Sequence, residues 1–385
     1  MTEQNPRTLT PTEVLKGTSP LVITAELEPV GGLDRFQPAG FPEIGHVIYK
    51  APRADGSEEP VCIVDSPASM ANHLESLCMR GAHDYDLTND LIGMPYLRCV
   101  TSTAEDDAGE LDESGSECVV TSLTEGHRIA STYFLGGKPL DRDRKVQDNT
   151  FDVTLVKEFG IALPGSKKAH PPASQWWNVF STIFKYDPNA LVHGVLFPQW
   201  QIKIPRLLTA HLEALGAGRV DRSGVKFDRL GKTNSGQPIF AVDDAVAQRI
   251  RATFILDTSL VQSFGRDDKG NSRGLKRGQK EFLIALALWK IQRLVGMPFR
   301  YRSGCHLALQ KDGLKANGEP AVIDVNIGDA INNADFGEAS SRITDIYWPR
   351  KELYREGKDE DQSSNGDAVI NQDDDSGDDE EEGEE

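Results

Sequence analysis

The sequence predicts an α+β fold with a ferredoxin-like, RRM-type core, a large inserted region and a disordered acidic tail. The first reason is the order of the core elements, which runs strand, helix, strand, insertion, strand, helix, strand. The second is composition, because 38% of the 385 residues are apolar, enough to bury a large core. The third is the C-terminal stretch 359–385, which holds fourteen Asp or Glu and no Lys or Arg. Such a segment cannot bury enough apolar surface to fold.

The first half of the core begins with "LVITAELE" at residues 21–28, where apolar residues alternate as in a strand. "HVIY" and "VCIVD" flank the turn residues "ADGS" and predict an accessory hairpin. In "DSPASMANHLESLCM", Ser66 is a favourable N-cap and Pro67 suits the first position of a helix. "YLRCV" and "CVVTSL" are predicted strands, joined by an acidic loop whose residues 105–117 include seven Asp or Glu.

The middle of the chain, residues 136–250, shows mixed patterns. "HRIASTYFL", just before it, is expected to begin a helix, and "SQWWNVFSTIFKY" has the apolar spacing of an amphipathic helix. "LVHGVLF" and "QWQIKI" are predicted strands. "PRLLTAHLEAL" is predicted as a further helix with Pro205 at its start.

The second half of the core opens with the predicted strand "ATFILDTSLV". "QKEFLIALALWKIQRLV" is apolar nearly all round and predicts a buried helix that Gly296 and Pro298 stop. The last core segment, "FRYRSGCHLAL", alternates as a strand. We expect the connections that leave the first and third core strands to lie at the same end of the sheet. This would place residues 265–280 beside the long loop after Glu28.

Alternation along that last segment separates a cationic face from a packed face. The cationic face holds Arg300, Arg302 and His306, and the packed face holds Phe299, Tyr301, Cys305 and Leu307. Arginine offers a planar fork of donors for phosphate, so the first face is a candidate phosphate-binding surface. A solvated strand face is the alternative reading.

Charge and cysteine content limit the possible partners and the compartment of the protein. The formal net charge is -18, but without the acidic tail and the acidic loop the remaining chain is close to neutral, so an RNA partner is not excluded. The five cysteines show no CxxC spacing, and we find no signal peptide and no apolar run that could span a bilayer. These features predict a cytoplasmic protein with free thiols.

The stretch "GRDDKGNSRGLKRGQK", residues 265–280, is the most basic part of the chain, with six Lys or Arg and four Gly. Glycines let backbone N–H groups approach a phosphate closely, and the cations supply charge, so this stretch predicts phosphate binding. The alternative is a mobile surface loop.

"GHRIAS" places His127 beside Arg128, as a general base with a cationic stabiliser would be placed in a ribonuclease. No second catalytic group is identifiable, so a backbone or phosphate contact is the favoured interpretation. "HDYD" with His73 and Glu75 fits no standard zinc or calcium spacing, and we expect neither a metal nor a cofactor.

Four of these stretches together resemble a CRISPR-associated RAMP family: "VDSPASMANHLE", "EGHRIASTYF", "SFGRDDKGNSRGLKRGQ" and "FRYRSGCHLAL" occur in its order. The chain resembles the Csb-one family, the backbone (Cas-seven-type) subunit of the type I-G, formerly I-U, Cascade complex. The similarity spans about residues 14–350. It implies a RAMP domain over 1–357 and a disordered tail over 358–385. Within the domain it implies an RRM-like palm at about 14–126 and 251–350, and an inserted finger and thumb region at about 127–250.

The resemblance also implies a function. Members are non-catalytic RNA-binding subunits that stack helically along the CRISPR RNA (crRNA) in a cytoplasmic ribonucleoprotein for antiviral defence. They hold the guide while it pairs with target DNA, together with other Cascade subunits and without a membrane. The RNA-binding residues it implies are Ser66, Ser69, Asn72, His127, Arg128, Arg266, Lys269, Arg273, Lys276, Arg277, Arg300 and Arg302. Two alternatives stay open: a RAMP endoribonuclease with His127 as its base, and a metal-dependent ribonuclease like the type III subunits, whose loop aspartate has no clear match here.

Overall fold

The computed structural model describes residues 5–40, 45–103, 115–161, 171–220, 243–268, 271–337 and 342–354, which form a mixed α+β fold. Most strands of the main body form one large sheet of order β1-β20-β19-β2-β15-β12-β4-β3, with β18 paired to β19 outside that order. The bounds of these strands are β1 (Arg7–Leu9), β2 (Leu21–Pro29), β3 (Ile48–Pro52), β4 (Glu58–Asp65), β12 (Leu208–Leu215), β15 (Arg249–Leu256), β18 (Phe299–Arg302), β19 (Cys305–Ala316) and β20 (Glu319–Ile323).

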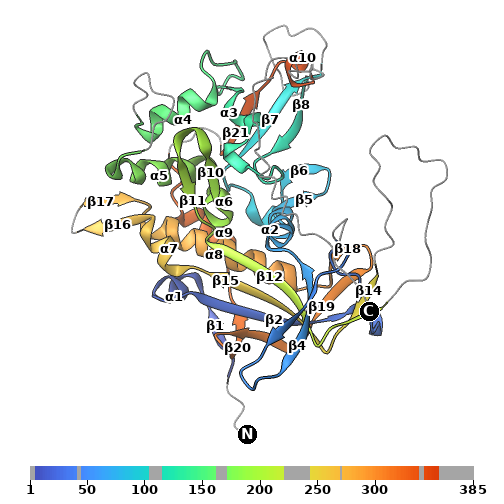
Figure 1. Ribbon diagram of the computed structural model, residues 1–385. Helices are drawn as coiled ribbons and strands as arrows, with labels where there is room; N and C mark the ends of the chain where they lie inside the picture. The colour runs from blue at the N-terminus through green and yellow to red at the C-terminus, as the bar shows by residue number, and fades with distance from the viewer. Residues whose placement is uncertain are drawn as a thin grey trace, which may run out of the picture.

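A second sheet has the order β8-β7-β21-β9 and lies at the top of Figure 1, away from the large sheet at the bottom. Its strands are β7 (Tyr96–Ser102), β8 (Ser116–Thr121), β9 (Lys138–Pro139) and β21 (Ile343–Tyr347). Two-stranded pairs complete the described strands: β5 (Met79–Gly81) with β6 (Asp84–Leu87), β10 (Val195–Phe197) with β11 (Ile202–Ile204), β13 (Gly218–Val220) with β14 (Asp244–Val246), and β16 (Gly265–Asp268) with β17 (Asn271–Gly274).

Helices lie between the two sheets and at their edges (Figure 1). The α-helices are α1 (Pro11–Leu15), α2 (Pro67–Ser76), α3 (Thr132–Leu135), α4 (Phe151–Phe159), α5 (Trp176–Tyr186), α6 (Pro188–His193), α7 (Thr258–Ser263), α8 (Arg277–Val295), α9 (Ile327–Asn333) and α10 (Arg350–Leu353). Short 3-10 turns include η2 (Asn89–Leu91) and η3 (Arg128–Ala130). In the described part of the chain, no helix combines the length and apolarity that crossing a membrane requires.

Helix α8 is the centre of the core, as its apolar sequence predicts. Residues from Phe282 to Ile291 are buried on every side of the helix, and it ends at Gly296 as expected. It contacts α1, α2, α6, α7 and α9. The helix therefore fixes the elements that carry the candidate site to one rigid framework.

The central strands β19, β2, β15 and β12 are neighbours, and each pair is antiparallel. The expectation that the chain leaves the first and third core strands at the same end of the sheet is therefore wrong: β2 and β15 are antiparallel and finish at opposite ends of the sheet. The loop after β2 reaches Gly304, whose carbonyl accepts the N–H of Gln37 at 2.9 Å. The hairpin of β16 and β17 lies at the other side of the molecule (Figure 1).

The largest error in secondary structure concerns "PRLLTAHLEAL", the expected helix, which is strand β12. Leu208, Ala210, Leu212 and Ala214 are buried while the residues between them are partly exposed, a period of two. Leu, Ala and Glu favour helices individually, but pairing with β15 and β4 on both sides overrides that preference.

Other predicted segments are confirmed only in part. "YLRCV" and "CVVTSL" are strands, but as β7 and β8 they belong to the second sheet and not to the core. "LVHGVLF" is the end of α6 followed by β10, and "HRIASTYFL" contains only η3 and the short α3. "FRYRSGCHLAL" is two strands, because the chain turns at Gly304, whose φ is +77°.

Several local predictions are confirmed. β3 and β4 form the hairpin around "ADGS", and "SQWWNVFSTIFKY" contains α5. All five cysteines lie among the described residues and carry free thiols. Burial raises the pKa of Cys62 to about 11 and that of Cys99 to about 12, so these thiols stay protonated and unreactive. The division into palm and inserted region stays a prediction.

Candidate nucleic-acid interface

The start of α2 gathers three of the predicted RNA-binding residues. Ser66 is the N-cap, and its Oγ accepts the backbone N–H of Ser69 at 3.2 Å. Ser69 is half-buried and Asn72 is exposed, while the opposite side of the helix packs into the core. The first two turns therefore present hydroxyl and amide groups to the surface, together with the positive end of the helix dipole.

A buried carboxylate lies beneath this turn. The side chain of Asp65, the last residue of β4, is 1% exposed. Its Oδ1 accepts the N–H of Ser66 at 2.9 Å and lies 2.8 Å from Nη2 of Arg302, and its Oδ2 lies 2.9 Å from Nε2 of His73. One carboxylate thus joins α2 to β18.

The charge of Asp65 is retained despite its burial. Burial by itself raises the pKa of this carboxyl, but the hydrogen bond with His73 and the charge of Arg302 outweigh it, and the net pKa lies below the usual range. The His73 ring also meets the rings of Phe299 and Tyr301 edge-on, at centroid distances of 5.4 and 5.5 Å. Together these contacts fix the position of Arg302 relative to the start of α2.

The two faces predicted around "FRYR" are confirmed only in part, because Phe299 and Arg302 are both half-buried and Arg302 pairs with the buried Asp65. Tyr301 and Cys305 are buried, whereas Arg300 is exposed and lies opposite the exposed His306 in the pairing of β18 with β19. Arg300 has no ion-pair partner among the residues that the structure describes. It is an exposed cation on β18, two residues before Arg302.

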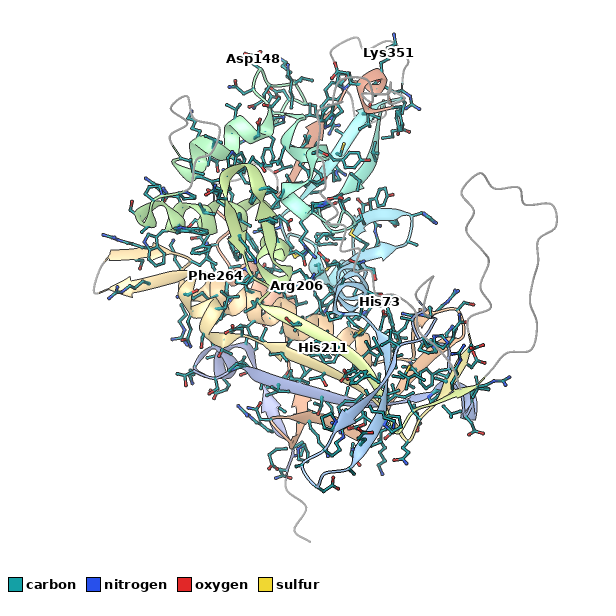
Figure 2. The ribbon with its side chains drawn as sticks, viewed as in Figure 1. His73, Asp148, Arg206, His211, Phe264 and Lys351 are labelled. Carbon is teal, nitrogen blue, oxygen red and sulfur yellow. The ribbon has the colours of Figure 1, made fainter. Side chains whose placement is uncertain are left out.

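The structure adds groups to this site that the sequence analysis missed. Arg206, exposed in the segment between β11 and β12, donates from Nη1 to the carbonyl of Pro67 at 3.3 Å. Figure 2 labels His73 on α2 and Arg206 close to the centre of the molecule. Arg206 was missed because the sequence from Pro205 onward was interpreted as a helix. The sequence analysis also missed Asp65 and its bond to His73. The one local signal for them is the acidic residue immediately before the N-cap serine.

Among the described residues, the basic stretch 265–280 forms a hairpin and the start of α8 instead of an irregular loop. Residues of β16 and β17 pair as a hairpin with Arg266 opposite Arg273. It projects beside α5 and α7 at the left of Figure 1. Gly265 and Gly274 close the hairpin, and the space that a Cβ would need at either is filled by backbone, so both glycines serve close packing. Lys269 lies outside the described residues.

Lys276 and Arg277 stand at the start of α8, and both have acidic partners. Nζ of Lys276 is 2.9 Å from Asp335, and Nε of Arg277 is 3.0 Å from Glu281. The side chains of these lysine and arginine residues are more than 60% exposed, so each pair contributes only about 0–1 kcal/mol to stability. Such weak pairs leave both cations able to exchange onto an RNA phosphate.

The "GHRIAS" motif divides into one exposed and one buried residue. The His127 side chain is 80% exposed, with Nδ1 3.3 Å from Oε1 of Glu125. Arg128 is 7% exposed, has a φ of +54°, and forms two bonds to Glu75 at 2.7 and 2.6 Å. The structure places this guanidinium inside the protein, so a phosphate contact by Arg128 would require the pair to open.

That ion pair is part of a buried polar network. Glu75 also accepts from Nδ2 of Asn189 at 2.7 Å, and the buried Lys290 donates to Oδ1 of Asn189 and contacts Nε2 of His193 at 2.9 Å. Residue Asp187 is completely buried nearby, and burial, followed by the charge of Glu75, raises its pKa to about 7. The network ties "GHRIAS" to α2, α6 and α8.

The group formed by "HDYD", His73 and Glu75 does not assemble into a metal site. Asp84 and Asp86 both pair with Arg80. Within the described ranges no three His, Cys, Asp or Glu side chains are grouped so as to hold a metal ion.

Nine of the twelve predicted residues thus lie on two separate surfaces. We name the first the α2 site (Ser66, Ser69, Asn72, Arg300 and Arg302) and the second the basic hairpin with its flank (Arg266, Arg273, Lys276 and Arg277). The other three are His127, which is exposed, Arg128, which is buried, and Lys269, which lies outside the described residues. Figure 2 shows Phe264, at the base of the hairpin, on the opposite side of the centre from His73. Arg206 lies between these two labels in this view.

Comparison with known proteins bears on identity. No curated protein matches the chain. Among solved structures, the crystal structure of Csc2 from Thermofilum pendens matches with 14% identity over 82% of this chain and 70% of that chain. The TM-score is 0.26, which does not establish a shared fold. The family model described as CRISPR-associated protein GSU0053 matches residues 21–219, more than half of the sequence. The chain therefore belongs to the CRISPR-associated GSU0053 family.

Proposed function

We propose that this chain is a non-catalytic crRNA-binding backbone subunit of a type I Cascade surveillance complex, of the I-G subtype. Membership of a CRISPR-associated family is the observation that carries the proposal. The four motifs that occur in the order of the Csb-one family support the I-G subtype. Copies would assemble side by side along the crRNA in the company of other Cascade subunits.

The arrangement of the large sheet supports an RRM-like palm whose second strand is β12, from within residues 127–250, in place of "YLRCV". In chain order, the four central strands are β2, β12, β15 and β19. Across the sheet they lie in the order β19-β2-β15-β12, which is fourth, first, third, second, and each neighbouring pair is antiparallel. Helix α2 lies between the first and second of them, and α8 lies between the third and fourth. This is the order of a ferredoxin-like core.

The chemistry of the α2 site suits RNA backbone. It combines serine hydroxyls, an amide, a helix start and two arginines, Arg300 and Arg302, whose donors are at most partly used by acceptors among the described residues. Groups of this kind bind phosphate and carry little sequence information. A subunit that holds the backbone in this way leaves the bases of the guide free to pair with target DNA.

A RAMP endoribonuclease remains the second candidate, because His127 is exposed and bonded to Glu125. A general base with a carboxylate partner could activate a ribose hydroxyl without a metal. Cleavage of repeat RNA in the presence of EDTA, lost on His127→Ala, would favour this candidate. The proposed backbone function predicts intact RNA with either protein.

The proposal is tested by titrating the purified protein into labelled single-stranded RNAs of unrelated sequence at several salt concentrations. We expect similar affinities for all sequences and a log–log salt slope of roughly -0.7 for each phosphate contact. Absence of RNA binding at low salt, or strong preference for one sequence, would contradict a sequence-independent backbone subunit.

A further inference from the structure

We propose that Asp65 is a positioning residue of the RNA site: its buried carboxylate, which is also bonded to His73, holds Arg302 in the geometry that receives an RNA phosphate. The inference rests on the proposed function and deepens it. Asp65 itself does not contact RNA, since only 1% of its side chain is exposed.

The carboxylate is fully engaged by protein groups. One oxygen receives the Ser66 N–H and lies 2.8 Å from Arg302, and the other is bonded to His73. Its lowered pKa keeps it ionised at neutral pH. A buried ionised carboxylate with partners on two elements fixes their relative position, as supporting residues do for the groups that contact a ligand.

Arg302 has capacity left for a second anion. Its side chain is 22% exposed, and only Nη2 has an acceptor among the described residues. A guanidinium carries five N–H donors in a planar fork, so one edge can stay on Asp65 while another meets a phosphate. Without its anchor, Arg302 would lose this orientation, and part of the binding free energy would be needed to order it.

The chain offers a matched control in the second sheet. Asp345, on β21, is a carboxylate that is 9% exposed and holds two arginines, Arg98 at 2.7 and 2.9 Å and Arg144 at 3.0 Å. It is similar to Asp65 in burial and in cationic partners but lies apart from α2 (Figure 1). Removing its charge should cost stability without changing the RNA site.

The experiment is a double-mutant cycle on affinity for a labelled single-stranded RNA, with Asp65→Asn, Arg302→Gln, the double variant and Asp345→Asn. Each protein is first shown to be folded at the assay temperature. We expect each of the two single changes at the α2 site to weaken binding roughly tenfold, and the double change to weaken it by a similar factor. The salt slope should fall by roughly 0.7 in all three, and Asp345→Asn should bind like wild type.

The sign of the effect is diagnostic. Simple electrostatics predicts that removing a carboxylate near a phosphate strengthens binding, so unchanged or tighter binding by Asp65→Asn would overturn the proposal. Losses that multiply in the double variant would also overturn it, because Asp65 would then act independently of Arg302. If the wild-type protein binds RNA and Asp65→Asn and Arg302→Gln bind it with the same affinity, the proposed function stands and this inference fails. If wild-type protein binds no RNA, both fail.

A second variant covers the case in which Asp65→Asn does not fold. Arg302→Lys keeps the charge but replaces the planar fork by a point charge, which cannot bridge Asp65 and a phosphate in the same way. We expect a loss close to that of Arg302→Gln. Wild-type affinity in Arg302→Lys would show that orientation of the guanidinium is unimportant and would overturn the proposal.

Discussion

Replacing Asp187 by asparagine should stabilise the protein above about pH 7 and remove the loss of stability that this carboxyl causes between about pH 5 and pH 8. Asp187 is completely buried and is the N-cap of α6, where its Oδ1 accepts the N–H of Ala190 at 3.3 Å. Its Oδ2 has no hydrogen-bond partner among the described atoms. Asparagine is an equally good N-cap, so the helix start is preserved.

The magnitude follows from the pKa of Asp187, which burial raises from 3.8 to about 7. A raised pKa means that the folded state binds the proton more tightly than the unfolded state. The contribution of this group is therefore most favourable at low pH and is lost as pH rises from about 4 to about 7. Three pKa units correspond to about 4 kcal/mol in total, of which about 3 kcal/mol falls between about pH 5 and pH 8.

The assay is urea denaturation of wild type and Asp187→Asn across that pH range, followed by tryptophan fluorescence. The amide costs some free energy if its N–H₂ is unpaired, but that cost is the same at every pH. The stability difference between the proteins should thus move in favour of the variant by about 3 kcal/mol from about pH 5 to pH 8. Asp257→Asn is the control, because Asp257 caps α7 in the same way but is only half-buried. A difference that stays constant with pH would show that folding does not raise the pKa of Asp187.

Three further outcomes are expected. Arg128→Ala should destabilise folding by about 3–5 kcal/mol in urea melts, because it leaves a buried carboxylate unpaired, and a loss below about 1 kcal/mol would contradict the buried pair. Changing Arg273, Lys276 and Arg277 together to alanine should reduce the salt slope of RNA binding by roughly 2 and leave folding intact, and an unchanged slope would show that the basic hairpin and its flank do not contact RNA. Deleting residues 359–385 should leave the melting temperature unchanged and strengthen unspecific nucleic-acid binding at low salt, and equal or weaker binding would reject screening by the tail.

Local sequence patterns predicted elements well where one signal dominated. Helix α8 is apolar all round and ends at a glycine, and β2 alternates cleanly, so both were predictable. In β12 two signals conflicted, because helix-favouring residues occur with a period of two. Only pairing with β15 and β4 decides such a case, and pairing depends on strands distant in sequence.

The candidate site shows the same limit. The N-cap at Ser66 could be predicted, because capping depends on a few adjacent residues. The contact of Asp65 with Arg302 could not, since it depends on how β18 is placed against α2. For Arg128 the sequence predicted a surface contact that the structure does not show. An arginine in a polar motif is usually exposed, and no local pattern reveals the buried Glu75 with which it pairs.

The proposed function requires several copies of this chain to bind side by side on one guide RNA. The decisive experiment mixes the purified protein in excess with single-stranded RNAs of increasing length and measures the mass of each complex by light scattering. We expect a mass that grows in steps of one chain at a constant RNA increment, with nuclease treatment returning the protein to its free state. One chain per RNA at every length, or a mass that does not depend on the RNA, would contradict it.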